Sequence, residues 1–222
     1  MKRGFDFLLA TISLLILWPV ILVLAVWVRL DSPGPAFHIE QRLGWRGKAF
    51  RIYILRTLRA NTGDQSPIAA SNDPRITRLG RWLRPSHLDE LPQLLNIVRG
   101  DMSLVGPRPA KSQLWEGIED NLRQRALAFR PGLTSPASIR FNCEDELLNE
   151  SDEPELLYRD ILFPARVKMD VKYFERGNRT GSPIDDFKLI LATVPGIVLA
   201  RERQRCRKRV MRLLEFRSRD TS

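Results

Sequence analysis

A run of 22 uncharged residues near the N-terminus constrains the fold of this chain more than any other feature. The segment FLLATISLLILWPVILVLAVWV, residues 7–28, contains no charged side chain. About 20 helical residues are enough to cross the hydrocarbon core of a bilayer. A signal peptide has a shorter apolar core, of roughly 7–15 residues, and a small-residue cleavage site after it. The sequence VRLD that follows offers no such site, so we expect a retained membrane helix over residues 1–30.

Pro19 lies near the centre of this segment. A proline inside a helix removes one backbone hydrogen bond, and a kink is expected there. Lys2 and Arg3 precede the segment, and Arg29 follows it. Positive residues tend to stay in the cytoplasm. A helix broken at Pro19 that enters the membrane and returns would leave both ends cytoplasmic, although a kinked helix that crosses the bilayer remains an alternative.

The remaining sequence predicts one cytoplasmic domain over residues 31–200. Alternating apolar residues on either side of a Gly44–Gly47 turn predict a short β-hairpin. Leu91, Leu94 and Val98 share one face of a helix that Gly100 would end. Further helices are expected over residues 144–169 and 185–199, the second broken at its Pro-Gly pair. The fold class is therefore α+β and predominantly helical.

The charge of the chain is uneven. The formal net charge is +10, and residues 201–222 carry nine Arg or Lys against three Asp or Glu. We expect this segment to be a basic amphipathic tail that lies against an anionic surface such as membrane lipid. The sequence contains no nucleic-acid-binding motif, so we expect no nucleic acid partner.

Two adjacent carboxylates, Asp89 and Glu90, precede the predicted helix at Leu91. Acids at a helix start have an ordinary explanation, since they offset the helix dipole by about 0.3–1 kcal/mol. Several arginines lie nearby in sequence, however, and Arg108 stands between two prolines in a stiff turn. A fixed guanidinium suits bidentate phosphate binding. Arg75 and Arg84 are weaker candidates for substrate contacts.

This combination of acids and arginines suggests phosphoryl chemistry beside a membrane. One carboxylate of the pair can attack phosphorus, while its neighbour holds Mg²⁺, which prefers oxygen ligands. The metal and Arg108 would offset the charge that develops on the phosphate.

The chain resembles the bacterial sugar transferases, which are monotopic polyprenyl-phosphate phosphoglycosyl transferases. The resemblance rests on an ordered series of motifs, namely SPGPAFHIEQRLGWRGKAF, Arg56-Thr57, DPRITRLGRWLR, LDELPQLLNIVRGDMSLVGPRP and RPGLTSP. It runs from Lys2 to about Pro136, and more loosely through DDFKLILATVPGIVL. Such enzymes initiate exopolysaccharide, O-antigen and glycoprotein glycan assembly.

The resemblance implies a two-step reaction at the cytoplasmic face of the bacterial inner membrane. Asp89 would attack the β-phosphate of a UDP-sugar and release UMP, and polyprenyl phosphate would then accept the sugar phosphate from Asp89. Glu90 would bind Mg²⁺, and Arg108 would hold a substrate phosphate. The sequence leaves open the sugar, the length of the lipid and whether the chain forms a homo-oligomer.

Several positions depart from the family pattern. Ile54-Leu55 replaces the usual Lys-Phe, His87 replaces a frequent Ser, and Ser135 replaces a frequent Gly. The departures near Arg56 leave room for an inactive assembly scaffold, and the basic tail supports a membrane-tethered anion-binding protein as a second alternative. Asp89, Glu90 and Arg108 are all retained, which favours the enzyme.

Overall fold

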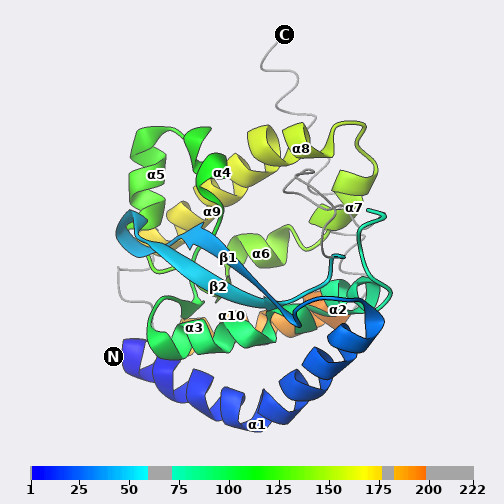
Figure 1. The fold of residues 1–222 in the computed structure, drawn as a ribbon. Coiled ribbons are helices and arrows are strands. Elements are labelled where there is room, and N and C mark those ends of the chain that lie inside the picture. Colours follow the sequence, from blue (N-terminus) through cyan, green and yellow to red (C-terminus); the bar gives the residue numbers. More distant parts are fainter. Residues whose placement is uncertain (1, 60–71, 177–182, 199–222) are drawn as a thin grey trace.

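The computed structural model describes residues 2–59, 72–176 and 183–198, and this part of the chain is mostly helical. Figure 1 shows α1 beneath the other elements, the hairpin across the middle and most later helices above. The helices are α1 (Lys2–Asp31), η1 (Trp45–Gly47), α2 (Gly80–Ser86), η2 (Leu88–Gln93), α3 (Leu94–Arg99), α4 (Ser112–Glu116), α5 (Asp120–Leu127), α6 (Pro136–Arg140), α7 (Glu144–Asn149), α8 (Pro154–Leu156), η3 (Leu157–Leu162), α9 (Phe163–Arg176) and α10 (Pro183–Val198). The strands are β1 (Phe37–Leu43), β2 (Ala49–Leu55), β3 (Ser103–Val105) and β4 (Gly132–Thr134).

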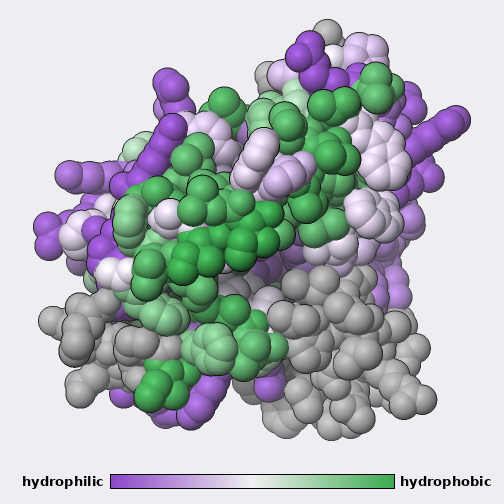
Figure 2. All heavy atoms as spheres, turned by 90° about the horizontal axis from the view of Figure 1, so that it is seen from below, coloured by the Kyte–Doolittle hydropathy of each residue, from purple (hydrophilic) through white to green (hydrophobic). Residues whose placement is uncertain are grey.

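The apolar helix α1 packs one side against the domain and leaves the other side exposed. Ala10 packs with Ile97 of α3, and Val28 packs with Leu83 of α2. Figure 2, seen from below, shows a broad hydrophobic area on this face of the molecule. The exposed apolar side chains of α1 are Phe7, Leu8, Ile12, Leu15, Ile16, Trp18, Val20, Leu22, Val23, Val26, Trp27 and Leu30. An exposed apolar surface of this kind is typical of a membrane contact.

Both ends of α1 are tied to the same domain (Figure 1). At the start, Arg3 donates to the carbonyl oxygens of Ile97 and Val98 at the end of α3, the second at 2.8 Å. At the other end, the buried Arg56 donates to the carbonyl oxygens of Pro33 at 2.6 Å and Ser32 at 2.7 Å. A guanidinium at a helix C-terminus satisfies carbonyls that lack helical partners. The contacts therefore hold α1 along the domain rather than at one end alone.

The predicted hairpin is confirmed. β1 and β2 pair antiparallel, with Phe37 opposite Leu55 and Leu43 opposite Ala49. The connection between them is a short 3₁₀ turn in which Gly47 has a φ of +72°, a conformation that glycine adopts at little cost. Ile52 of β2 is buried in the same cluster as Ala10 of α1, so the hairpin forms part of the platform on which α1 lies.

A second sheet consists of two short parallel strands. Ser103 of β3 pairs with Gly132 of β4, and Val105 pairs with Thr134. Gly106 and Gly132 pass so close together that a Cβ on either residue would overlap the neighbouring backbone. Close backbone contact is one of the few reasons for which a chain requires glycine. This contact fixes the start of the turn that carries Arg108.

The later helices differ from the sequence expectation in two places. The helix predicted over 144–169 is interrupted, because α7 ends at Asn149 and the chain turns before Pro154 starts the next helical segment. That segment continues through η3 and α9 to Arg176. The break predicted in the last helix is wrong, since α10 runs through Pro195-Gly196 to Val198. A proline costs one hydrogen bond of a helix but does not have to end it.

Candidate active site

The two predicted carboxylates lie in a 3₁₀ turn between α2 and α3. His87 ends α2 in the left-handed conformation, with φ 54° and ψ 18°, and its N–H donates to the carbonyl oxygen of Arg84 at 3.1 Å. Such a conformation is unusual for a residue with a side chain and recurs at functional sites. It turns the chain directly into η2, which presents Asp89 and Glu90. Asp89 and Glu90 therefore lie in the short turn directly before α3.

Glu90 is held by Arg108, a contact that the sequence analysis did not predict. The Nη2 atom of Arg108 lies 2.7 Å from Oε1 of Glu90, and Nδ1 of His87 lies 3.7 Å from the same oxygen. Burial alone would raise the pKa of Glu90, but Arg108 and His87 hold it well below its ordinary value. Glu90 in turn raises the pKa of His87. Glu90 is therefore the permanently charged member of the pair.

Asp89 lies in a different environment. Its Oδ1 atom is buried and has no hydrogen-bond partner among the described residues. Burial, followed by the neighbouring Glu90 charge, raises the pKa of Asp89 to about 7. Buried carboxylate oxygens normally have partners, and an unpaired one is costly. Two adjacent acids with pKa values pushed in opposite directions are characteristic of a reactive site.

The two weaker candidates, Arg75 and Arg84, lie on the α2 side of the pair. The Nε atom of Arg75 is 2.9 Å from each carboxylate oxygen of Asp73, so this guanidinium is engaged in a local ion pair. Arg84 lowers the pKa of both Asp73 and Asp89. Arg84 is thus close enough to act electrostatically on Asp89, whereas Arg75 is engaged chiefly by Asp73.

Arg108 lies among ionisable residues that the sequence analysis missed. Its pKa is raised by Glu90 first, and then, against the effect of burial, by Tyr158 and Glu144. Glu144 forms an ion pair with the buried Arg166 of α9. These residues lie more than thirty positions beyond Arg108, so only the packing of α7, η3 and α9 brings them to the site.

A further buried acid, Asp170, lies one helical turn after Arg166. Its Oδ1 atom accepts a hydrogen bond of 2.9 Å from the backbone N–H of Ala137 at the start of α6. Burial raises the pKa of Asp170 to about 6. The spacing of Arg166 and Asp170, four residues apart in an otherwise amphipathic helix, is the sequence signal that could have identified them.

The residues at the carboxylate pair fit Mg²⁺ bound together with a substrate. The described residues include no group of three or more His, Cys, Asp or Glu side chains that could hold a metal on their own. Mg²⁺ commonly uses one or two carboxylates, water and the phosphates of a substrate. Asp89 offers an unpartnered carboxylate oxygen, and Arg108 engages Glu90 through Oε1 only. Glu90 is therefore a suitable ligand for an ion that arrives with a diphosphate.

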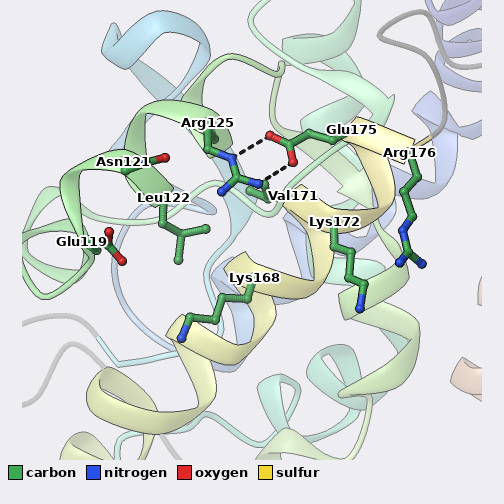
Figure 3. A pocket seen from close by; sticks show the side chains of 9 residues that line it. All are labelled: Glu119, Asn121, Leu122, Arg125, Lys168, Val171, Lys172, Glu175 and Arg176. Carbon is green, nitrogen blue, oxygen red and sulfur yellow. Dashed lines mark hydrogen bonds and ion pairs between the residues drawn. The ribbon is translucent and has the colours of Figure 1, made fainter.

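A hollow of about 490 Å³ lies elsewhere, between α5 and α9 (Figure 3). Arg125 and Glu175 form an ion pair across it, with Arg125 Nε 2.7 Å from Glu175 Oε1. Lys168 and Lys172 extend from the α9 wall. None of the predicted site residues lines this hollow. Charged side chains on the exposed face of an amphipathic helix explain its lining, and we assign it no function.

Comparisons with a family model and with individual proteins point to the same family. A model described as bacterial sugar transferase matches residues 1–201. The exopolysaccharide production protein PSS of Rhizobium leguminosarum bv. phaseoli is 38% identical, over 87% of this chain and 93% of its own length. The UDP-glucose:undecaprenyl-phosphate glucose-1-phosphate transferase of Caulobacter vibrioides is 36% identical, over 89% of this chain and 69% of its own. The protein of that name from Escherichia coli is 34% identical, over 87% of this chain but only 39% of its own length. Because the family model matches almost the whole chain, the protein belongs to the bacterial sugar transferase family.

Proposed function

We propose that this protein transfers a sugar 1-phosphate from a UDP-sugar to a polyprenyl phosphate and releases UMP. The family and the names of its relatives support this class of reaction. UDP-glucose and undecaprenyl phosphate are the first substrates to test, since two relatives are named for them. Two relatives are named for exopolysaccharide production, which supports a role at the start of a polysaccharide pathway.

The observation that carries the proposal is the unpaired, buried Oδ1 of Asp89. Asp89 is adjacent to Glu90, which pairs with Arg108, and the charge of Arg84 also acts on the Asp89 carboxylate. A nucleophile needs a free lone pair and cations that accept the charge of the attacked phosphate. Asp89 has both, whereas Glu90 is already engaged.

In the first step, an Asp89 carboxylate oxygen attacks the β-phosphorus of the UDP-sugar. The bond from that phosphorus to the bridging oxygen breaks, and UMP leaves with the oxygen. In the second step, a phosphate oxygen of the lipid attacks the same phosphorus, and Asp89 leaves as a carboxylate. Each step exchanges one P–O bond for another, so no further reactant is required.

Arg108 and Glu90 prepare the site for these steps. Arg108 has several N–H donors, of which Glu90 occupies one at 2.7 Å, so the guanidinium can hold Glu90 and a substrate phosphate together. The Arg108 charge keeps Glu90 ionised. Mg²⁺ bound by Glu90 would offset the negative charge of the diphosphate.

We further propose that α1 enters the membrane and returns, which leaves the domain on the cytoplasmic face of the inner membrane. In support, Arg3 and Arg56 tie opposite ends of α1 to one domain, and α1 is long and apolar enough to reach across a bilayer. α10 also has exposed apolar residues, namely Ile184, Phe187 and Leu191. Thiol labelling of single-cysteine variants at Lys2 and at Asp31 in spheroplasts tests this topology, and external labelling of only one end would contradict it.

The basic tail is the main support for a membrane-tethered anion-binding protein without catalysis, and it lies outside the described residues. Nothing among the described residues favours that alternative or an inactive scaffold over an enzyme. The test of function is UMP release from a panel of UDP-sugars by the full chain, with Mg²⁺ and undecaprenyl phosphate. Release over many turnovers that depends on both donor and lipid supports the transferase, and the absence of UMP release with every donor would favour the scaffold.

A further inference from the structure

We propose that α2 is the docking element for the lipid acceptor, with Trp82 against the polyprenyl chain and Arg84 on its phosphate. The opposite side of the carboxylate pair, around Arg108, is then left for the nucleotide. This inference rests on the proposed function and assigns its two substrates to different sides of Asp89.

Trp82 lies at the border of the membrane-facing surface. It is 53% exposed, and its ring centroid is 6.3 Å from that of Trp27, which is 51% exposed at the C-terminal end of α1. Tryptophan is favoured at membrane–water boundaries because its ring is apolar and its N–H is polar. Trp27 and Trp82 therefore mark the level at which α2 meets the lipid.

Trp82 and Arg84 point to opposite sides of α2. Residues two apart on an α-helix are separated by roughly 200° around its axis. Arg84 is correspondingly half-buried, and its charge acts on Asp89. A single short helix thus has a side chain for the apolar tail on its outer face and a cation for the phosphate on its inner face.

The reactive pair lies close to the membrane helix on this side. Leu88, the residue before Asp89, packs against the cluster that contains Leu24 and Val28 of α1 and Leu83 of α2. A lipid phosphate at the membrane surface therefore has a short path around the end of α2 to Asp89. The lipid tail can stay beside Trp27 and Trp82 throughout.

Apart from Glu90, the residues that act on the charge of Arg108 lie away from α1. These ionisable neighbours, Tyr158, Glu144 and Arg166, belong to η3, α7 and α9, which Figure 1 shows above the hairpin and away from α1. A water-soluble diphosphate can reach this side from solvent, whereas a membrane-bound lipid would have to leave the bilayer. The lipid would therefore bind on the side of the site nearer the membrane, and the nucleotide on the side nearer the solvent.

The test separates the two half-reactions of the full-length protein in nanodiscs. UMP release in the first turnover needs no lipid, and transfer to undecaprenyl phosphate follows it. We expect Trp82→Ala and Arg84→Gln each to raise the KM for undecaprenyl phosphate at least about tenfold. Trp82 lies outside the carboxylate site, so Trp82→Ala should keep the amplitude of the first UMP burst within about twofold of wild type. Arg84→Gln should lower that burst less than it lowers transfer to the lipid.

Arg81→Gln is the matched control, because Arg81 is an exposed cation of the same helix. It is expected to leave both half-reactions unchanged. If Arg84→Gln lowers the UMP burst as much as the transfer, or if neither variant changes the KM for the lipid, the assignment is wrong. An equal effect of Arg81→Gln would also overturn it, since general surface charge would then explain the result. If the wild type releases no UMP, the proposed function itself fails, and this inference fails with it.

Discussion

The Nη2 atom of Arg108 lies 2.7 Å from Oε1 of Glu90, and this contact gives the two adjacent acids opposite properties. Glu90 stays charged because Arg108 offsets its burial. Asp89 has no such partner at Oδ1, and its pKa is raised to about 7. The difference between neighbours explains why Asp89, rather than Glu90, is the proposed nucleophile.

The first prediction concerns this ion pair. Arg108→Gln should lower kcat at least about a hundredfold, because both the phosphate clamp and the charge that ionises Glu90 are lost. Since Arg108 is 40% exposed, the cost in unfolding free energy should be only about 1 kcal/mol. Steady-state kinetics and denaturant unfolding measure the two effects. In the double variant Arg108→Gln/Glu90→Gln, stability should recover while activity stays low; recovery of activity would contradict the assigned roles.

The second prediction concerns the anchor of α1. Arg56 is buried and donates to carbonyl oxygens after the end of α1, at 2.6 Å and 2.7 Å. Arg56→Lys keeps the charge but cannot reach several carbonyls at once, so the unfolding free energy should fall by roughly 2–3 kcal/mol. Thermal unfolding in detergent measures the loss. Arg51→Gln, a change at an exposed position of β2, the strand that precedes Arg56, should stay within about 0.5 kcal/mol of wild type.

The third prediction is a pH dependence of stability that originates at Asp170. Burial raises its pKa from 3.8 to about 6 in the folded protein, so the folded state binds the proton more tightly than the unfolded state. Stability should therefore fall as the pH rises from about 4 to 6, by roughly 1–3 kcal/mol from this group. Asp170→Asn remains neutral and should lack that component. Denaturant unfolding at several pH values measures it, and equal slopes for the two proteins would show that Asp170 is not the source.

The fourth prediction concerns the backbone contact behind Arg108. Gly132→Ala would place a methyl group against the backbone of Gly106, so β3 and β4 must separate. Arg108 lies two residues after Gly106, and its position relative to Glu90 should change with the strands. We expect a loss of stability of about 1–3 kcal/mol and a larger relative loss of activity. Gly117→Ala, where a Cβ would meet nothing within 4 Å, is the matched control, and equal effects of the two changes would refute this account.

The sequence was sufficient for features that depend on neighbouring residues. The hairpin followed from alternating residues around Gly47, and the apolar helix from its length and composition. Glu90 and Arg108 were assigned to one site because both stand in one run of 23 residues, HLDELPQLLNIVRGDMSLVGPRP, although their direct contact was not predicted. Local patterns of this kind carry most of the information that a single sequence offers.

The surroundings of Arg108 could not be anticipated, because they depend on long-range packing. Glu144, Tyr158 and Arg166 reach the site only when α7, η3 and α9 fold over it. The break predicted at Pro195 was wrong, because a proline removes one hydrogen bond of a helix without having to end it. The roles of Arg75 in substrate binding and of Glu90 in metal binding remain predictions.

The central claim is a covalent sugar phosphate on Asp89, and trapping it is the most direct test. The full chain would be incubated with UDP-[¹⁴C]glucose and Mg²⁺ without lipid acceptor, then denatured and digested for mass spectrometry. We predict label on the peptide that contains Asp89, release of that label by undecaprenyl phosphate, and no label in Asp89→Asn. If wild type transfers sugar phosphate to the lipid but carries no label, or if Asp89→Asn is labelled equally, the proposed role of Asp89 is wrong.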